Sequence, residues 1–418
     1  MGINDKKRGP FSRFLIFLFK TVLYAVLCVL IVLIVMNVFV PIYDYGEPKP
    51  FSGDYLHNPY QDMDPEYWKQ CNFHAHTDQY GGVTDGRNTP NEVLDSVYNA
   101  FGFDHIGISD YMKINDYVKF RPGFIPAYEH GYNVFKIHQL CLGAEKVRYI
   151  DYFFFQNLSM KQHMINRLSQ QNRFVVLAHP SFVEGSYKVK DMKYLSNYKL
   201  MEVLNGYCLS PEHWDMALSN GHLVYLIADD DSHNSLSSRD VACRFTMINA
   251  KENNADDLLE ALVSGNAVGV DFKKIWQESL PDKRDRLEKD LPYLTKAELV
   301  DTIFTVGASK MLAKVQFIGQ GGKILKEVDY VDEASYNIRP EDQYVRTVLY
   351  FVDGTALYLN PVTRHDSPDI IKQRLDHISY IKTALLWLVY CFVISLIIAY
   401  ISAKRRKNKR KNVVVKRY

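Results

Sequence analysis

Two histidines separated by one residue, His74 and His76, are the part of this chain whose spacing most directly indicates chemistry. They follow an extended, partly apolar run from Trp68 to Phe73. In a β-strand, residues i and i+2 point to the same face, so the two imidazoles converge on one point. A metal ion requires such convergence, and the pair is therefore a candidate metal site of a hydrolytic enzyme. A lone His-x-His pair is weak evidence, so the prediction depends on further ligand residues later in the chain.

Further imidazoles and carboxylates occur at the ends of predicted strands. Asp231 and His233 repeat the i, i+2 spacing, and His179 ends the apolar run FVVLAHP. Any one of these residues is more often a hydrogen-bonded side chain, a turn residue or a helix cap. Their repetition favours a metal site instead, because imidazole and carboxylate are the ligands of zinc, iron and manganese. The complete set after His76 is Asp85, Glu129, His138, His179, Asp231 and His233.

The elements that must position these residues alternate between short strands and helices. A capping box at Thr89–Glu92 predicts a helix over Pro90–Ala100, and Gly265 ends a second helix over Ala255–Ser264. Alternation of this kind predicts a mostly parallel sheet, open or closed into a barrel, with the active site at the carboxyl ends of its strands. The predicted strands are Trp68–His74, His105–Ser109, Gln139–Gly143, Arg173–Ala178, Leu200–Leu204, Leu223–Ala228 and Ala242–Ile248.

The pattern changes after about Asp271. Residues 273–311 are charged and helical in character, and they predict a helical connector. Residues 312–365 read as short strands with hairpin turns at Gln320–Lys323 and Asp353-Gly354, which predicts a small β-rich domain without a catalytic signal. A second connector is expected over residues 366–382.

Two uncharged apolar runs, Thr21–Val40 and Thr383–Ala403, are each long enough to cross a hydrocarbon core of about 30 Å as a helix. Basic residues lie on the terminal side of both runs, so residues 1–20 and 404–418 are predicted to be cytoplasmic. A linker over residues 41–67 then leads to a catalytic domain outside the cytoplasm, periplasmic or extracellular. Buried soluble helices, or a signal peptide at the N-terminus, are the alternatives, although no small-x-small cleavage site follows the first run.

Charge is distributed unevenly along the chain. The overall net charge is +2, whereas residues 1–42 carry +4 and residues 404–418 carry +9, so the region between them carries −11. An acidic domain argues against nucleic-acid binding. Its four cysteines, Cys71, Cys141, Cys208 and Cys243, have no zinc-type spacing; they read mostly as buried thiols, and a disulfide is not required.

Roughly residues 68–270 resemble the polymerase and histidinol phosphatase (PHP) superfamily. The matching motifs, in order, are HAHT, TDG with TPNEVLDSVYNAFGFDHIGISD, PAYEHG, HQLCLG, LAHP and DDDSH. The resemblance implies a distorted seven-stranded β/α barrel of the TIM-like kind over residues 68–272. It also implies two or three divalent metal ions, Zn²⁺, Mn²⁺ or Fe²⁺, in a cleft at the strand ends. The implied activity is hydrolysis of phosphoesters.

The resemblance also implies a role for each matching residue. The implied ligands of the first metal are His74, His76 and Asp231, and those of the second metal are His138 and His179. Glu129 is implied to bridge the two metals. Glu145 is a second choice for the bridge. Glu129 is preferred because His138 then follows at the family's spacing.

The chain departs from the family pattern at the third metal. Asp85 and His233 would hold that metal, but the imidazole expected after Asp110 is replaced by the phenol of Tyr111. The third site is therefore weak, uses Tyr111 as an unusual ligand, or is absent.

The reaction expected from two metals about 3.5–4 Å apart is in-line attack on phosphorus by a metal-bridging hydroxide. Glu129 and Asp231 are the expected catalytic carboxylates, and Tyr111 and Arg239 the expected donors to the phosphoryl oxygens, with Arg87 and Lys113 as further candidates.

Two other functions remain open at this point. An amidohydrolase-like enzyme shares the first His-x-His pair, although AHP and DSH fit it less well. A non-catalytic, membrane-tethered module that binds metal or ligand would explain the phenol at Tyr111. For an enzyme, the partners expected are a phosphorylated small-molecule or cell-envelope substrate and the lipid bilayer. The residues do not identify the substrate or the oligomeric state.

Overall fold

The computed structural model of the chain describes residues 9–82, 86, 87, 89–370 and 372–415. These residues form two compact units. The first, which we call the helical unit, contains the described parts of residues 1–44, 152–160 and 377–418. The second, which we call the folded domain, contains those of residues 45–151 and 161–376.

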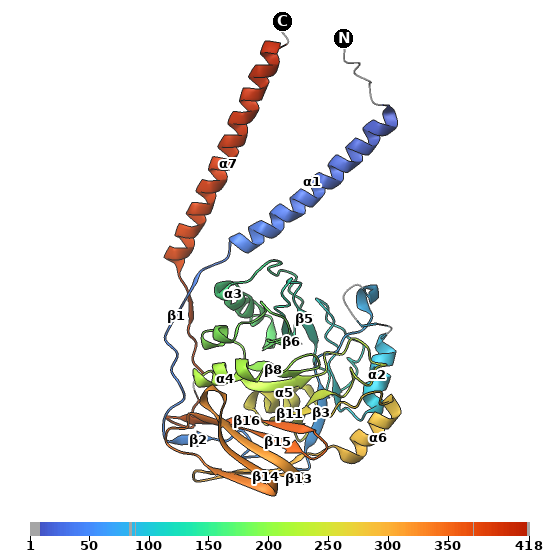
Figure 1. Cartoon of the computed structure of the whole chain (residues 1–418), viewed down its shortest axis with the longest axis vertical. Coiled ribbons are helices and arrows are strands. Elements are labelled where there is room, and N and C mark those ends of the chain that lie inside the picture. The colour runs from blue at the N-terminus through green and yellow to red at the C-terminus, as the bar shows by residue number, and fades with distance from the viewer. Residues whose placement is uncertain (1–8, 83–85, 88, 371, 416–418) are drawn as a thin grey trace. The chain divides into compact units, whose positions relative to one another are not determined.

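Two long helices dominate the helical unit, α1 (Pro10–Val38) and α7 (Tyr380–Val415) (Figure 1). The stretches Pro10–Val38 and Tyr380–Lys407 are long and apolar enough to cross a membrane. Their mean hydropathies are 2.8 and 2.6, and none of the residues in the apolar part of either stretch is buried. Both helices extend beyond the predicted runs at their terminal sides, because Arg13, Lys20 and the basic residues after Ala403 are good helix formers. At its other end α1 stops at Val38, two residues before the predicted end.

The strands of the folded domain form a ten-stranded and a five-stranded sheet. The first has the order β12-β13-β15-β16-β11-β10-β3-β4, with β14 beside β13 and β2 beside β16, and the second has the order β5-β6-β7-β8-β9. The strands of the ten-stranded sheet are β2 (Tyr55–His57), β3 (Trp68–Asn72), β4 (His105–Ile106), β10 (Arg244–Asn249), β11 (Ala267–Asp271), β12 (Leu294–Val300), β13 (Ile303–Gly319), β14 (Lys323–Asn337), β15 (Tyr344–Phe351) and β16 (Ala356–His365). Those of the other sheet are β5 (Ala127–His130), β6 (Gln139–Ala144), β7 (Asn172–Leu177), β8 (Leu200–Asn205) and β9 (Tyr225–Asp229).

The remaining elements are helices and one short strand pair. Strands β1 (Tyr43–Tyr45) and β17 (Asp376–Ile378) form a two-stranded sheet. The other α-helices are α2 (Asn91–Ala100), α3 (Leu158–Leu168), α4 (Pro211–Ser219), α5 (Ala255–Ser264) and α6 (Leu280–Asp290). Short 3₁₀ segments are η1 (Gln79–Gly82), η2 (Val189–Lys193) and η3 (Gln320–Gly322).

The structure is mixed α/β, as predicted, but its strand pairing does not confirm the predicted distorted seven-stranded barrel. Within the described residues, one ladder joins β3 to β4, and a separate set of ladders runs from β5 through β9. The two sheets are connected by isolated parallel bridges, Tyr111–Glu129 and Ala75–Ser232. The expectation of a mostly parallel sheet was wrong. Strand β6 is antiparallel to β5 and β7, and β10 is antiparallel to β3 and β11. The loop between β5 and β6 is too short for the crossover that parallel neighbours require.

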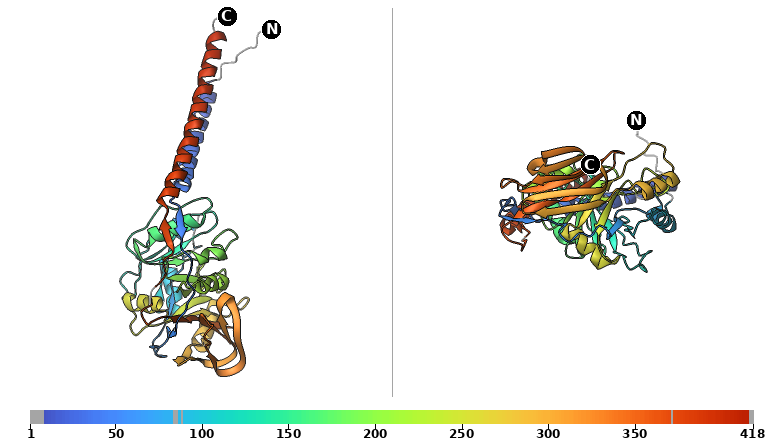
Figure 2. Two further views of the ribbon diagram at one scale, coloured as in Figure 1. Left: turned by 90° about the vertical axis from the view of Figure 1, so that its left-hand side faces the viewer. Right: turned by 90° about the horizontal axis from the view of Figure 1, so that it is seen from below.

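The chain was predicted to contain a separate small β-rich domain. Its strands instead belong to the ten-stranded sheet. Strand β16 pairs with β11 through Val268–Leu359 and Val270–Leu357, and these four side chains lie in one hydrophobic core. The predicted helical connector over 273–311 is helical only in α6. It continues as β12 and β13, where alternate apolar side chains such as Phe304 and Val306 are buried, as a strand requires. The longest strands, β13 and β14, form the hairpin drawn in orange in Figure 2.

Local signals predicted most element positions within a few residues. Helix α5 has the predicted bounds, and Gly265 ends it with a φ of 85°. The predicted capping box before α2 is absent. Pro90 occupies the N-cap, and the Thr89 hydroxyl donates to the Arg87 carbonyl oxygen instead of accepting from the helix. All six cysteines are free thiols; Cys71, Cys141 and Cys243 are buried and Cys208 is partly buried.

Candidate metal centre

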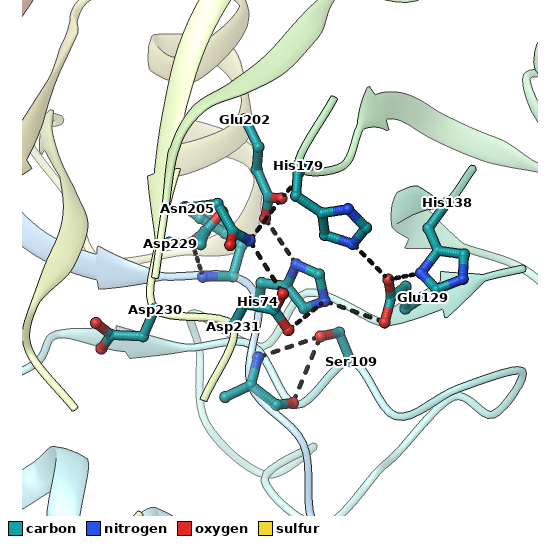
Figure 3. A network of polar contacts seen from close by, with 12 residues as sticks. His74, Ser109, Glu129, His138, His179, Glu202, Asn205, Asp229, Asp230 and Asp231 are labelled. Carbon is teal, nitrogen blue, oxygen red and sulfur yellow. Dashed lines mark hydrogen bonds and ion pairs between the residues drawn. The ribbon is translucent and has the colours of Figure 1, made fainter. Parts of the chain in front are cut away.

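Four buried side chains, His74, His76, Glu129 and Asp231, bring their donor atoms together at the ends of strands β3, β5 and β9. Figure 3 labels His74, Glu129 and Asp231 of these four. The Nε2 atoms of His74 and His76 lie 3.2 Å apart. Glu129 Oε2 lies 3.2 Å from the first nitrogen and 3.1 Å from the second. Asp231 Oδ1 lies 3.3 Å from each. We call these four residues the first donor group.

A second donor group shares Glu129 with the first. Glu129 Oε1 lies 2.5 Å from His138 Nδ1 and 3.0 Å from His179 Nε2. The carboxylate therefore directs one oxygen to each group. The structure thus brings together all six residues assigned by resemblance to the first two metals, in the predicted grouping. Their role as metal ligands remains a prediction.

Backbone turns directly after the strands aim two of these side chains. His179 follows β7 with a φ of 30°, and Asp231 follows β9 with a φ of 50°. Neither residue is glycine, so both occupy a conformation that costs of order 1–3 kcal/mol and is concentrated at functional sites. Neighbouring hydrogen bonds hold the second turn, because Asp230 accepts the backbone N–H groups of Ala242, Cys243 and Arg244.

Glu202, in the middle of β8, orients the donor residues His74 and His179 through hydrogen bonds. Its Oε1 accepts a 2.7 Å hydrogen bond from His74 Nδ1, and its Oε2 accepts the backbone N–H of His179 at 2.8 Å. Asn205 donates to both Glu202 and Asp231 at 3.1 Å. With its proton on Nδ1, neutral His74 directs the lone pair of Nε2 into the first donor group, as a metal ligand must.

The first donor group has the dimensions of a cation site. A tetrahedral ion about 2.0–2.1 Å from each donor would place neighbouring donors about 3.3 Å apart. The five separations that involve an imidazole nitrogen are 3.1–3.3 Å. In addition, Glu129 Oε2 and Asp231 Oδ1 are buried and accept no well-aligned hydrogen bond within the described part of the chain. Buried anionic oxygens in such surroundings require a cation, so the residues fit a metal ion.

The carboxylates control the protonation of the metal-free site. Burial alone would lower the pKa of His74, but Asp231, Glu202 and Glu129 outweigh it and raise the pKa well above its ordinary value. Burial likewise opposes the charge on His76, yet Asp231 and Glu129 raise its pKa to about 9. Against burial, the imidazoles hold the pKa values of Glu129 and Asp231 well below the ordinary range. Protons thus take the place of a cation, and metal binding must displace them.

The described residues expected at a third metal, His233 and Tyr111, do not belong to either donor group. His233 Nε2 lies 3.4 Å from Asp231 Oδ1, and its ring stacks on His76 with centroids 4.4 Å apart. The Tyr111 ring also stacks on His76, at 4.6 Å. Asp85 lies outside the described residues. The carboxylate of Asp110, next to Tyr111, accepts hydrogen bonds from the backbone N–H and the hydroxyl of Thr77.

A cavity of about 1090 Å³ lies beside the site, and Tyr111, His138 and His233 form part of its lining. Two cations, Arg87 and Lys136, lie in its wall. Of the other predicted donors, Lys113 bonds to Gln79, and the guanidinium of Arg239 lies over the Trp276 ring at 4.6 Å, so neither lines the cavity. The catalytic role of Arg239 remains a prediction. The full lining is Tyr80, Arg87, Tyr111, Met112, Gly131, Tyr132, Asn133, Lys136, His138, Tyr207, His233, Asn234 and Asp240.

Of the two carboxylates predicted for the bridge, Glu129 is fully buried between the imidazoles and Glu145 is exposed. Sequence reasoning missed Glu202 and Lys136. A signal existed for Glu202, because a carboxylate within the apolar strand LMEVLN requires a buried partner. For Lys136, in the loop between β5 and β6, no signal in the sequence distinguishes it from a solvated lysine.

In comparisons with known proteins, no family model and no curated protein matches the chain. Among solved structures, the chain is similar to a two-domain protein from Bacteroides vulgatus that contains a predicted PHP-like metal-dependent phosphoesterase. The sequences are 13% identical, and the match covers 80% of this chain and 98% of that one with a TM-score of 0.39. A likeness of this degree does not assign a family.

Proposed function

We propose that the chain is a divalent-metal-dependent hydrolase of phosphoesters. The observation that carries the proposal is Glu129, whose two buried oxygens belong to two different groups of imidazole and carboxylate donors. A carboxylate shared by two neighbouring cation sites suits a hydrolase that uses two metal ions. The motifs that resemble the PHP superfamily add the phosphoester as the substrate class.

Bound in the two donor groups, divalent cations would supply Lewis acidity toward phosphoryl oxygens and acidify a water nucleophile. The chain's own residues prepare the site for this chemistry. Glu202 keeps the proton of His74 on Nδ1 and so leaves Nε2 as a donor. In the cavity wall, Arg87 and Lys136 offset the negative charge of the phosphoryl group, and the Tyr111 phenol can donate a hydrogen bond to it.

The donor atoms suit Zn²⁺, Mn²⁺ or Fe²⁺, because they combine imidazole nitrogen with carboxylate oxygen and include no thiolate. We assign two ions to the described residues. A third ion would depend on Asp85, which lies outside those residues, and on His233 beside Tyr111.

The two apolar helices support membrane anchoring. Basic residues precede the apolar part of α1 and follow that of α7, which favours cytoplasmic termini with the folded domain on the other side of the membrane. Substrates in that compartment would be phosphorylated small molecules or phosphoester components of the cell envelope.

The proposal is tested with the purified full-length chain in detergent, loaded with Zn²⁺ or Mn²⁺. Release of product from generic phosphomonoesters and phosphodiesters is measured for the wild type and for Glu129→Gln and Glu145→Gln. We expect activity in the wild type and in Glu145→Gln, and a loss of at least about 10²-fold in Glu129→Gln. Equal activity of the two variants, or full activity of His76→Ala, would show that the donor groups do not carry the reaction.

A further inference from the structure

A second cavity lies wholly within the helical unit. It has a volume of about 400 Å³, at the lower end of the range of small-ligand pockets. Its walls come from the end of α1 and the residues after it, from the first turns of α7, and from the segment Tyr152–Met160. That segment contains three consecutive phenylalanines and no charged residue, and the Phe155 side chain is 65% exposed.

Hydrogen bonds fix the walls of this cavity. The backbone N–H of Ile42 donates to Thr383 Oγ1 at 2.9 Å, and its carbonyl oxygen accepts the N–H of Ser379 at 2.9 Å. Asn37 Nδ2 donates to the carbonyl oxygen of Phe155 at 3.2 Å, and the N–H of Tyr43 donates to Ser159 Oγ at 3.1 Å. The cavity is thus built by specific contacts and does not result from two helices passing each other.

Most of the lining is apolar, and its amide and hydroxyl side chains are Asn37, Asn157, Ser159 and Tyr390. Ile34, Val38, Leu386 and Met160 contribute hydrocarbon surface, which water does not fill favourably. Ser159 Oγ and Asn157 Oδ1 accept the backbone N–H groups of Tyr43 and Met160. Asn37 Oδ1, in contrast, is buried and accepts no hydrogen bond from the described residues. An occupant would therefore combine hydrocarbon with a hydrogen-bond donor.

Aromatic rings beside the cavity indicate where it lies relative to a bilayer. Phe39 packs edge-on against Trp387 and Tyr390, with ring centroids 6.0 Å apart in both pairs. Aromatic residues at the end of a spanning helix mark the membrane–water interface. The cavity is therefore at the depth where head groups meet acyl chains.

We propose that this cavity binds one phospholipid of the surrounding bilayer, with acyl carbons against the apolar wall and a donor-bearing head group, such as ethanolamine, at Asn37. The inference rests on the membrane anchoring proposed above. A phospholipid is favoured over a protein partner because both helices that line the cavity would already be surrounded by lipid.

The test uses native mass spectrometry of the full-length chain in detergent with equimolar dioleoyl phosphatidylethanolamine and dioleoyl phosphatidylcholine. We expect one retained phosphatidylethanolamine per chain. Val38→Phe fills the cavity and should weaken retention about tenfold. Val29→Phe, the same change at an exposed site of the same helix, should leave retention unchanged. Asn37→Leu should remove the preference for ethanolamine over choline.

Equal retention in Val38→Phe and Val29→Phe, or a head-group preference that survives Asn37→Leu, would overturn the lipid site. Quenching of Trp387 by brominated lipids in vesicles, with Trp387→Phe as the blank, tests the anchoring separately. Quenching without a retained lipid refutes the lipid site alone. Absence of quenching refutes membrane insertion and the lipid site together, while the phosphoesterase assay remains independent of both.

Discussion

At the scale of single residues, Glu129 links the two donor groups. Its two oxygens face His76 and His138 at 3.1 and 2.5 Å, so one side chain couples the two donor groups. Glu202 acts on the same groups from outside, through the ring of His74 and the backbone of His179. Loss of Glu129 should therefore affect both groups, whereas loss of Glu202 should loosen their orientation.

Glu202→Gln should weaken metal binding by about 10- to 100-fold without removing a donor atom, because a neutral amide holds the His74 proton less strongly. The measurement is a competition titration of the metal-free chain with a chromogenic zinc chelator. Glu212→Gln, an exposed change at the start of α4, is the matched control. Unchanged affinity in Glu202→Gln would mean that this carboxylate serves packing alone.

The residues with a recognisable pattern could be predicted from the sequence. The spacing of His74 and His76 predicted that their rings converge, and the structure places their Nε2 atoms 3.2 Å apart. Glu202 and Lys136 were missed because their roles depend on contacts between distant parts of the chain. No local rule shows that Glu202 meets a ring 128 positions earlier.

At the scale of elements, the turns after strands determine the site. The turn after β8 lies against the turn after β9, where the N–H of Gly206 donates to the Asp229 carbonyl oxygen at 3.0 Å. A Cβ atom on Gly206 would lie 1.8 Å from the carbonyl oxygen of Asp230. The close approach therefore requires glycine, and it positions Asp231, the next residue.

Gly206→Ala should displace the turn that carries Asp231, with a stability loss of about 1–3 kcal/mol and weaker metal binding in the first donor group. Denaturant unfolding and metal titration together measure the two effects. Gly46→Ala, where an added Cβ makes only an ordinary 3.7 Å contact, should change neither. If Gly206→Ala binds metal like the wild type, the turn does not control Asp231.

A buried histidine at the start of β4 predicts a dependence of stability on pH. Burial lowers the pKa of His105 from 6.5 to about 4, so the folded domain binds this proton less readily than the unfolded chain. The contribution to the free energy of unfolding is complete above pH 6.5. It falls by about 1.4 kcal/mol per pH unit between pH 6.5 and 4.

Denaturant unfolding of the full-length chain with a chelator present, from pH 7.5 to 4, measures this loss. His105→Gln should show a flatter pH profile than the wild type. Identical slopes in the two proteins would mean that the proton on His105 is not linked to unfolding.

Pairing between distant strands could not be predicted from the sequence. Individual strands and helix α5 follow from local alternation and end signals. The ladder between β11 and β16 joins residues about ninety positions apart, and nothing local distinguishes it from a separate β-rich domain. The two-sheet arrangement therefore appears only in the structure.

At the scale of the whole molecule, the membrane topology proposed from the two long apolar helices can be tested in cells. If both termini are cytoplasmic and the folded domain is outside, as proposed, a protease should cleave the folded domain in cells whose outer envelope has been opened and whose cytoplasmic membrane is intact. Epitope tags at both ends should stay protected until the membrane is permeabilised. Digestion of either tag while the cytoplasmic membrane is intact would contradict this orientation, but it would not bear on the proposed metal centre.

The count of bound metal ions tests the central claim most directly. After chelator treatment and reloading with Zn²⁺, the full-length chain should hold two ions by elemental analysis. His76→Asn and His138→Asn, which each weaken one donor group, should each hold about one, and Glu129→Gln should lose affinity for both. A folded wild-type chain without stoichiometric metal, or two ions retained in Glu129→Gln, would contradict a two-metal centre built around Glu129.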